Sequence, residues 1–383
     1  MRNARPWFAV AATLLAGTAW AQPAATAGWQ PCTALAAREE RLACFDRWAA
    51  GQGAQSAPTA PAREPYPGQA ERAAAAGPAP VEPLQPATRI VTVATEDGCK
   101  DRQYSELSRF WELQSGTDCG TFGLRSYRPI SLSAIAADSV NRLPTSGNPA
   151  NNPEQPQAFG STEMRVQLSV RTKIAQGLLT AGHPTLKDSL WFGYTQQSYW
   201  QLFNGAISRP FRSTDHEPEL VYVYPLDQAL GGGWKLRLGG LGLVHQSNGQ
   251  SLPLSRSWNR VYLLAGVEQG FRFRLQGRLW QRLHEPAERD DNPGISNYVG
   301  RAEVAGFWTL DDDNTLGLTV RHALKSPGRG SARLEWLQTL GRSANQNSSL
   351  RLHAQLFSGY GDSLLDYNRA RTVFMLGLSL VDF

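Results

Sequence analysis

Residues 271–283 read Phe-Arg-Phe-Arg-Leu-Gln-Gly-Arg-Leu-Trp-Gln-Arg-Leu, with apolar residues at most odd positions and arginines at many even positions. Alternation with a period of two predicts a β-strand with one apolar face and one charged face. Such a strand fits a membrane barrel, which turns its apolar face to lipid and its polar face to the lumen. Soluble β-sandwiches show the same period, but they seldom carry so many arginines inside. We therefore expect an all-β protein.

Similar alternating segments recur from about Phe122 to Phe383, separated by Gly, Asn, Asp and Pro. About twelve segments are found, an even number that suits a closed single-chain barrel with both termini on the periplasmic side. The expected strands lie near 122–134, 162–178, 188–203, 218–226, 234–248, 256–269, 271–283, 297–310, 315–324, 331–340, 349–360 and 372–383. The terminal Phe383 fits the aromatic end of many such barrels, although it is out of phase with the last strand. We predict a twelve-stranded antiparallel transmembrane β-barrel over residues 122–383, with a mostly irregular N-terminal extension.

Residues 1–21 have the pattern of a secretory signal peptide. Positive residues at the start and an apolar run from Trp7 to about Gly17 are followed by the small residues of Ala19-Trp-Ala21, so the mature chain is expected to begin near Gln22. No later stretch approaches about eighteen consecutive apolar residues, so we expect no transmembrane helix. Export and the barrel pattern together predict a location in the bacterial outer membrane.

Three further segments precede the predicted barrel. Residues 22–50 form a small cysteine-containing segment, either a stapled helical turn or a hairpin. Residues 51–88 are rich in Ala and Pro with almost no large apolar residue, which is typical of a linker. Residues 89–121 form a pre-barrel segment with a second cysteine pair, which either plugs the periplasmic mouth or tethers a small subdomain.

The cysteines and the charge limit the possible partners. Four cysteines in the first third of the chain suit two disulfides in an oxidising compartment. They allow three pairings, of which we favour the local one, Cys32 with Cys44 and Cys99 with Cys119. No C-x-x-C spacing occurs, which argues against zinc. The net charge of +5 comes mostly from arginines that alternate along strand-like segments, so no nucleic-acid partner is expected.

A second stretch carries the candidate chemistry: His245-Gln-Ser247-Asn-Gly249, followed by Ser-Arg-Ser-Trp-Asn at residues 255–259. His245 and Ser247 share one face of a strand because they are two residues apart. In a hairpin centred on Leu252, Asn259 lies opposite His245, within cross-strand reach. The stretch therefore predicts a nucleophile, a base and an orienting group in one hairpin.

The apolar register predicts which face carries this trio. Asn259 alternates in phase with Val261 and Leu263, and Leu243 shares the face of His245. Leu236 and Leu238 are in the opposite register, so we expect a bulge at Gly239-Gly240 that exchanges the faces. The trio is then on the outside of the barrel, where polar catalytic groups are useful only if the substrate is itself in the membrane.

The expected chemistry is that of a serine hydrolase. A serine needs a base to take its proton, and His245 is placed to do so for Ser247. Asn259 would accept a hydrogen bond from the other ring nitrogen and fix the tautomer. Backbone N–H groups around Gly249 and a bound cation would stabilise the tetrahedral oxyanion. The turn from Gln250 to Ser255 offers hard oxygen ligands of the kind that calcium takes.

Four further short motifs precede this stretch in the chain. In order, they are Tyr194-Thr-Gln196, Trp200-Gln201, Pro210-Phe-Arg212 and Glu217-Pro-Glu-Leu220. Together they resemble bacterial outer membrane phospholipase A, and the resemblance covers roughly residues 122–383. It implies a twelve-stranded barrel that hydrolyses acyl esters at the sn-1 and sn-2 positions of phospholipids, and of lysophospholipids too. It also implies dependence on calcium and activation by homodimerisation in the outer leaflet.

The resemblance assigns a role to each of eight residues. It makes Ser247 the nucleophile, His245 the base and Asn259 the orienting residue, with the amide of Gly249 in the oxyanion hole. One calcium ion per active site would be bound by Ser255, by the carbonyl of Gln250 and by the carbonyl of Ser208 of the partner subunit. Many members have arginine where Gln250 stands. Gln196 matches a glutamine that the family places in the dimer interface, within the apolar band.

Two other functions fit the same sequence. A passive pore or structural barrel with a vestigial site would conduct ions without hydrolysing esters, and a lipid A deacylase would be a barrel esterase with another substrate. The remaining histidines are interpreted as loop, lumen or girdle residues: His183, His216, His284, His322 and His353. The acidic stretches at residues 290–292 and 311–314 lack the spacing of an EF-hand and are interpreted as solvated turns.

Overall fold

The computed structural model of the protein describes residues 30–53, 98–209, 211–343, 346–347 and 350–380. The predicted signal peptide, most of the predicted linker and the terminal Phe383 lie outside the described residues. The chain divides into two compact units, which are residues 1–90 and 91–383.

The first unit contains two short helices joined by a disulfide. Helix α1 spans Gln30–Thr33, helix α2 spans Arg38–Gly53, and the bond between Cys32 and Cys44 links them with a Cα–Cα distance of 5.5 Å. This confirms the favoured pairing, and α2 continues through residues 51–53 of the predicted linker. None of the described helices is long and apolar enough to cross a membrane.

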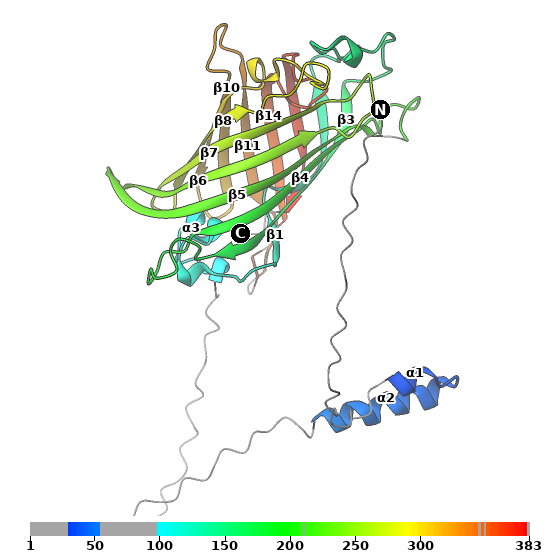
Figure 1. Ribbon diagram of the computed structural model, residues 1–383, viewed down its shortest axis with the longest axis vertical. Helices are drawn as coiled ribbons and strands as arrows, with labels where there is room; N and C mark the ends of the chain where they lie inside the picture. Colours follow the sequence, from blue (N-terminus) through cyan, green and yellow to red (C-terminus); the bar gives the residue numbers. More distant parts are fainter. Residues whose placement is uncertain (1–29, 54–97, 210, 344–345, 348–349, 381–383) are drawn as a thin grey trace, which may run out of the picture. The chain divides into compact units, whose positions relative to one another are not determined.

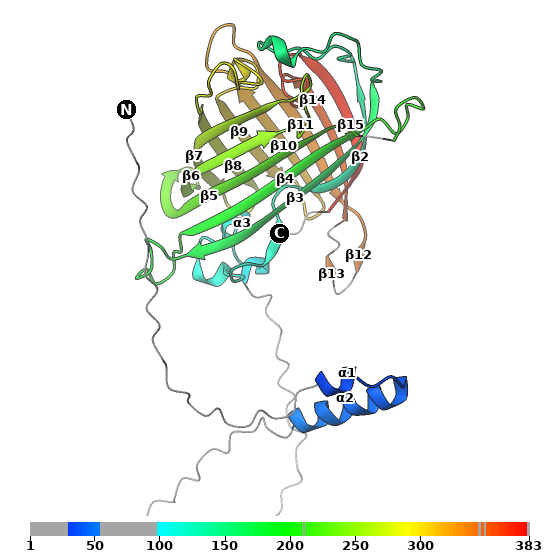
Figure 2. The same cartoon turned by 45° about the vertical axis from the view of Figure 1, so that its right-hand side comes forward.

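The second unit is a closed antiparallel β-barrel of twelve strands (Figures 1 and 2). The barrel strands are β2 (Ile130–Ala137), β3 (Thr162–Gln176), β4 (Ser189–Trp200), β5 (Phe211–Gly231), β6 (Trp234–Ser247), β7 (Ser257–Gln269), β8 (Phe273–Arg282), β9 (Ala302–Thr309), β10 (Asn314–His322), β11 (Gly330–Thr339), β14 (Leu350–Gly359) and β15 (Arg371–Leu380). Strand β15 pairs with β2 and closes the barrel. The predicted fold and strand number are confirmed, and each predicted segment overlaps one barrel strand.

Three short strands accompany the barrel. Strand β1, Leu124–Ser126, pairs with β3 as β2 does, but in a register that differs by two residues, and Pro129 lies between β1 and β2. Proline has no N–H to donate to the ladder, so the strand predicted over residues 122–134 is interrupted there. Strands β12, Arg342–Ser343, and β13, Gln346–Asn347, form a small hairpin between β11 and β14.

The two faces of the barrel wall differ as the alternating pattern predicts. On β7, Val261 and Leu263 are exposed on the outside, whereas Arg260 and Leu264 are buried inside. Many charged residues that face the lumen form ion pairs; one example is Arg212 on β5, whose Nε lies 2.6 Å from a carboxylate oxygen of Glu163 on β3. The wall is therefore apolar outside and ionic inside, the arrangement that a membrane barrel requires.

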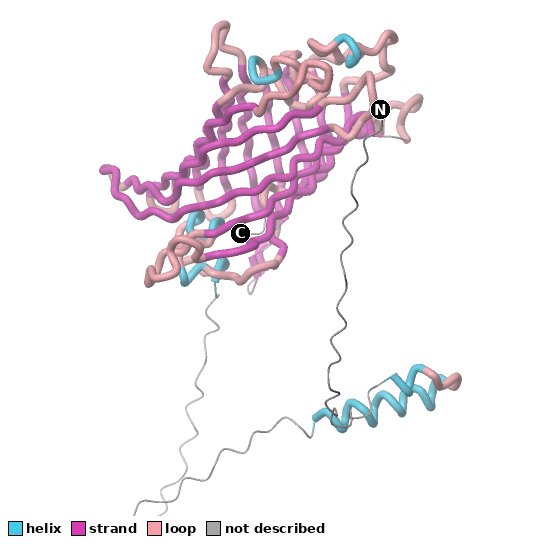
Figure 3. Tube along the Cα trace, in the orientation of Figure 1, coloured by secondary structure: helices cyan, strands magenta, loops and turns pink. Residues whose placement is uncertain are grey.

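Residues 98–121 of the pre-barrel segment pack into the end of the barrel at which the chain enters it (Figure 3). They contain the short turns η1 (Gly98–Lys100) and η2 (Ser115–Thr117), helix α3 (Glu106–Trp111) and the predicted disulfide between Cys99 and Cys119. Trp111 is buried against Trp191 of β4, and its indole N–H donates to Gln276 of β8 at 3.3 Å. These contacts make the segment a plug of the barrel, one of the two interpretations that the sequence leaves open.

Two details of the strands differ from the sequence predictions. Strand β5 runs over residues 211–231, well beyond the predicted 218–226, because polar residues and Pro218 hide its alternation. The register shift in β6 lies between Leu236 and Leu238, so the prediction of a bulge at Gly239-Gly240 was wrong. Arg237 occupies the bulge, where its Nε lies 2.9 Å from a carboxylate oxygen of Glu268 in the lumen. The ion pair draws Arg237 inward, and the strand changes face at that point.

Candidate active site

The hairpin of β6 and β7 has the register that the sequence predicts. His245 pairs with Asn259, and Ser247, the last residue of β6, pairs with Ser257. The ring Nδ1 of His245 lies 2.9 Å from the side-chain oxygen of Asn259. Since β6 alternates regularly after its bulge, Ser247 shares the outer face with His245 and the exposed Leu243. The structure thus brings all three predicted catalytic residues to one patch on the outside of the barrel, at the end opposite the plug.

The inner face beneath this patch is held by hydrogen bonds and a cation–π contact. Trp258 of β7 is fully buried, and its indole N–H donates to the side-chain oxygen of Gln246 at 2.9 Å. The guanidinium of Arg260 lies over the Trp258 ring, 3.9 Å from the centroid, and donates to Gln246 as well. These contacts fix the backbone on which His245 and Asn259 are mounted, because each of the inner residues is adjacent to one of them in sequence.

The turn between the two strands is held from within. The side-chain oxygen of Asn248 accepts from the backbone N–H of Gln250 and of Arg256, and its amide N–H donates to the carbonyl of Leu254. Arg256 is fully buried and donates to backbone carbonyls of its own turn and of residues 144 and 151. Burial lowers the pKa of this guanidinium, and the electrostatic attraction of Tyr367 and Asp291 acts in the opposite direction. Gly249 has φ = +60°, a left-handed conformation that glycine adopts readily.

The turn gathers oxygen atoms near Ser255. The Ser255 hydroxyl donates to a carboxylate oxygen of Asp291 at 2.7 Å, and the Ser257 hydroxyl donates to the same oxygen at 3.1 Å. The side chain of Gln250 donates to the backbone carbonyl of Arg212 at the start of β5. The prediction that residues 290–292 form a solvated turn was wrong, because this turn supplies Asp291 to the site and its other two members are buried.

The third predicted calcium ligand lies in a different loop. Ser208 belongs to the connection between β4 and β5, and its carbonyl accepts a hydrogen bond from the indole N–H of Trp200 at 2.7 Å. A carbonyl oxygen has a second lone pair, so this bond leaves one acceptor position for another ligand. The prediction assigns Ser208 to the site of a partner subunit, and no contact with Ser255 of the same chain is required.

A second histidine stands beside Ser247. His216 pairs with Ser247 across β5 and β6, and its Nδ1 lies 2.7 Å from the hydroxyl of Tyr194. A Cβ atom on Gly249 would be 3.6 Å from the His216 ring. His216 was interpreted as a loop, lumen or girdle residue, and that interpretation missed its place next to Ser247, the predicted nucleophile. The alternation of β5 contains the signal, because His216 is in phase with the outward-facing Leu220.

Gln196 neighbours His216 on the next strand. It pairs with His216 across β4 and β5, accepts a hydrogen bond from the Tyr194 hydroxyl at 3.2 Å and donates to the Ser198 hydroxyl at 3.1 Å. An amide has two donor hydrogens and two acceptor lone pairs, so one of each is left for a further partner. Gln196, Tyr194 and His216 thus form a polar strip on the outer face beside Ser247.

An apolar groove of about 660 Å³ runs along the outer face of β4 to β8. Leu243 and Val261 line it, and they stand two residues before His245 and two residues after Asn259 on the same face. The other lining residues include Leu190, Leu220, Leu241, Leu263 and Leu279. The polar trio therefore stands at the edge of a surface suited to an acyl chain.

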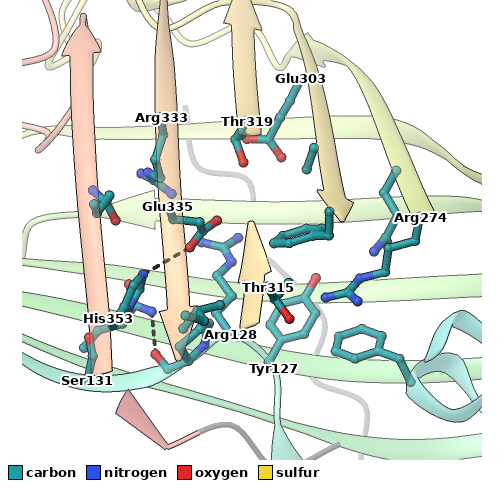
Figure 4. A pocket seen from close by; sticks show the side chains of 18 of the residues that line it. Tyr127, Arg128, Ser131, Arg274, Glu303, Thr315, Thr319, Arg333, Glu335 and His353 are labelled. Carbon is teal, nitrogen blue, oxygen red and sulfur yellow. Dashed lines mark hydrogen bonds and ion pairs between the residues drawn. The ribbon is translucent and has the colours of Figure 1, made fainter. Parts of the chain in front are cut away.

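The lumen is lined by charged and polar side chains. A cavity of about 180 Å³ lies there, bounded by α3 and by charged side chains such as Arg333 and Glu335 (Figure 4). His353 faces this cavity, and its Nε2 lies 3.2 Å from a carboxylate oxygen of Glu335, so the interpretation of this histidine as a lumen residue is confirmed. The plug and the ion pairs give no support to a passive pore.

Comparisons with known proteins agree with the geometry. The family model of phospholipase A1 matches residues 107–380. A putative phospholipase A1 of Neisseria meningitidis serogroup B is 33% identical over 366 residues, which cover 92% of this chain and 90% of that protein. The phospholipase A1 of Escherichia coli K12 is 35% identical over 220 residues, which cover 57% of this chain and 70% of the relative.

Solved structures show the same architecture. The outer membrane phospholipase A of Escherichia coli matches with a TM-score of 0.58 at 30% identity and covers 69% of this chain and 94% of its own. The Salmonella typhi outer membrane phospholipase, solved as a dimer with bound calcium, matches with a TM-score of 0.59 at 30% identity and the same coverage. The chain therefore belongs to the phospholipase A1 family, and its fold and enzyme class are those of an outer membrane phospholipase A.

Proposed function

We propose that the protein hydrolyses acyl esters of membrane phospholipids, at the sn-1 and sn-2 positions and in lysophospholipids, with Ser247, His245 and Asn259 as its catalytic residues. The observation that carries this proposal is the hydrogen bond between His245 and Asn259 on the outer face, at the edge of the apolar groove. An ester bond near the membrane surface reaches that edge while its acyl chain stays in an apolar environment. The Escherichia coli relative has a solved variant in which an active-site asparagine is replaced by alanine, which supports a role for Asn259.

The hydrogen bond to Asn259 prepares His245 to act as a base. The amide oxygen only accepts, so Nδ1 of His245 carries a hydrogen and Nε2 has a free lone pair. Nε2 takes the proton of Ser247 as its hydroxyl oxygen attacks the ester carbonyl carbon. The imidazolium then returns that proton to the leaving alcohol as the ester C–O bond breaks, which leaves an acyl-enzyme. Water, deprotonated by His245, releases the fatty acid and restores Ser247.

The negative charge that develops on the carbonyl oxygen needs a donor. The N–H of Gly249, two residues past Ser247, is the proposed donor, and the left-handed conformation of this glycine sets the direction of its amide. One oxyanion-hole donor is typically worth about 2.7–4 kcal/mol of transition-state stabilisation. The internal hydrogen bonds of the turn keep the donor in place before the substrate arrives.

Calcium is the proposed cofactor. The hydroxyl of Ser255 and the carbonyl of Gln250 belong to one turn, and the Asp291 carboxylate beside Ser255 adds a negative oxygen, which is the donor chemistry that calcium prefers. Ser208 of the partner subunit would supply a further carbonyl, so that one ion per active site bridges the dimer. A bound calcium ion would add positive charge near the developing oxyanion.

The proposed active form is a homodimer in the bacterial outer membrane, which the chain reaches by means of its signal peptide. Gln196 is the proposed contact within the apolar band, because its remaining donor and acceptor would otherwise face lipid. The dimer of the Salmonella relative supports this assembly.

Replacing Ser247 by alanine tests the proposal. The Ser247→Ala protein should remain a folded barrel whose mobility in gels changes on heating, and it should lose phospholipid hydrolysis by about 10³-fold or more, because it has no nucleophile. A calcium chelator should abolish the activity of the unmodified protein and weaken its dimers. Hydrolysis by Ser247→Ala, or activity indifferent to the chelator, would contradict the nucleophile or the cofactor respectively. Product analysis with lipid A as a second substrate separates this function from that of a lipid A deacylase.

A further inference from the structure

We propose that Glu285 is a positioning residue for the hydrolysis, because it sets the orientation of the Asn259 amide. The inference rests on the roles proposed above for Asn259 and His245. The side-chain NH2 of Asn259 donates to Oε1 of Glu285 at 2.9 Å, while its oxygen lies 2.9 Å from Nδ1 of His245. Glu285 follows β8 and is 26 residues away from Asn259 in the chain, so the contact is a product of the fold.

The carboxylate leaves the amide only one favourable orientation. An ionised carboxylate accepts hydrogen bonds and cannot donate them. The NH2 group of Asn259 must therefore face Glu285, and the amide oxygen is left for His245. That oxygen accepts from Nδ1, so the free lone pair of the ring is on Nε2, the nitrogen available to Ser247.

The opposite orientation would stop the reaction. A flipped amide would direct its oxygen at the carboxylate of Glu285, where two acceptors repel each other. It would also direct its NH2 at Nδ1 of His245 and so stabilise the tautomer with the hydrogen on Nε2. A protonated Nε2 cannot take the proton of Ser247. When the third member of a triad is a neutral amide, the hydrogen-bond partner of that amide therefore decides which tautomer of the histidine is favoured.

Glu285 is itself held in place. Its second oxygen, Oε2, lies 2.9 Å from the guanidinium of Arg282, and the same guanidinium lies 2.6 Å from Asp290. The backbone N–H of Leu283 donates to the carbonyl of Asn259 at 2.8 Å. This bond holds the start of the loop after β8 against β7. The Glu285 side chain is 17% exposed, so little solvent competes with these contacts.

The role of Glu285 depends on its acceptor atoms more than on its charge. Arg282 sits beside the carboxylate and offsets most of its field at His245. A glutamine at this position would still present a carbonyl oxygen to the NH2 of Asn259, whereas an alanine would present nothing. The two substitutions are therefore expected to separate in their effects.

The test is a double-mutant cycle in the full-length protein, in detergent micelles with calcium and a phospholipid substrate. Glu285→Ala should lower kcat by about tenfold and leave KM unchanged, because a hydrogen bond that fixes the base acts on the chemical step. Glu285→Gln should stay within about threefold of the unmodified protein. In the Asn259→Ala background, Glu285→Ala should have no further effect on kcat, because a residue that acts through Asn259 has nothing left to orient.

Glu288→Ala is the matched control, because Glu288 is an exposed carboxylate of the same loop. It should leave kcat unchanged. An equal loss of kcat in Glu288→Ala, or a Glu285→Ala effect that persists in the Asn259→Ala background, would overturn the inference and indicate a general role in loop stability. If Asn259→Ala lowers kcat but Glu285→Ala does not, the inference about Glu285 fails and the proposed function stands. If neither Asn259→Ala nor Ser247→Ala lowers kcat, the proposed function itself fails.

Discussion

Two histidines flank Ser247 on the outer face of the barrel, and they have different neighbours. His245 precedes Ser247 on β6 and faces Asn259, whose amide is anchored to Glu285 in the loop after β8. His216 lies beside Ser247 on β5 and faces the hydroxyl of Tyr194. The two rings share the residue type and the outer face, and they differ in their place relative to Ser247 and in their hydrogen-bond partners.

In the proposed mechanism, this difference distinguishes the base from the neighbouring histidine. The amide oxygen that faces His245 can only accept, which places the ring hydrogen on Nδ1 and frees Nε2. The Tyr194 hydroxyl has a single hydrogen, which it can donate either to Gln196 or to Nδ1 of His216, so both tautomers of His216 remain available. The proposed mechanism therefore takes His245, and not His216, as the base for Ser247, because the amide oxygen that faces His245 favours a single tautomer.

Removing each ring in turn is the strongest test of this comparison. His245→Ala should lower kcat by about 10³- to 10⁴-fold, the range expected for loss of a general base that activates a nucleophile. His216→Ala should change kcat by less than about threefold, because its tautomer is not fixed toward Ser247. Steady-state hydrolysis of a phospholipid by calcium-saturated protein measures both effects. Equal losses in the two variants would show that His216 shares the role of base.

Removing the partner of each ring should give a smaller effect in the same direction. Asn259→Ala should lower kcat by about 10- to 100-fold at unchanged KM, which corresponds to the loss of roughly 1.4–2.7 kcal/mol. Tyr194→Phe keeps the aromatic ring and removes only the hydroxyl, and it should change kcat by less than about threefold. Steady-state kinetics that determine kcat and KM separately compare the two variants. A larger loss in Tyr194→Phe than in Asn259→Ala would reverse the assignment of the two sides.

The sequence predicts one side of this comparison much better than the other. The trio of His245, Ser247 and Asn259 follows from strict alternation and one hairpin centre, and both depend on neighbouring residues alone. Glu285 approaches Asn259 from a loop with no periodicity, and no local rule indicates that contact. His216 was missed for another reason, because Pro218 and the acidic residues around it hide the strand that carries it.

In the barrel too, features set by neighbouring residues in sequence were predicted, whereas a feature set by a residue on another strand was not. Most of the twelve strands were predictable because they alternate over many residues, and a shift of one position would turn leucines inward. The bulge in β6 was predicted at the glycines, where the backbone is most permissive, but it lies at Arg237. Its cause is a carboxylate, Glu268, on the neighbouring strand across the hairpin, and a pattern read along one strand does not contain it.

The polar strip of Gln196, Tyr194 and His216 beside Ser247 is expected to lie in the dimer interface. The last prediction, which has the smallest expected effect, tests this role. Gln196→Leu should weaken the calcium-bound dimer about 3- to 20-fold, since hydrogen bonds between membrane segments contribute roughly 0.6–1.7 kcal/mol each. The activity per dimer should stay the same, because Gln196 has no contact with His245 or Asn259. Gln338→Leu is the control, because Gln338 on β11 is in phase with the outward-facing Leu334 and does not line the groove. Sedimentation in detergent at graded protein concentrations measures the dimer, and activity measured at saturating dimer separates assembly from chemistry. A loss of activity per dimer in Gln196→Leu would mean that the strip with His216 also orients the catalytic groups. The assignment of that strip to dimerisation alone would then be wrong.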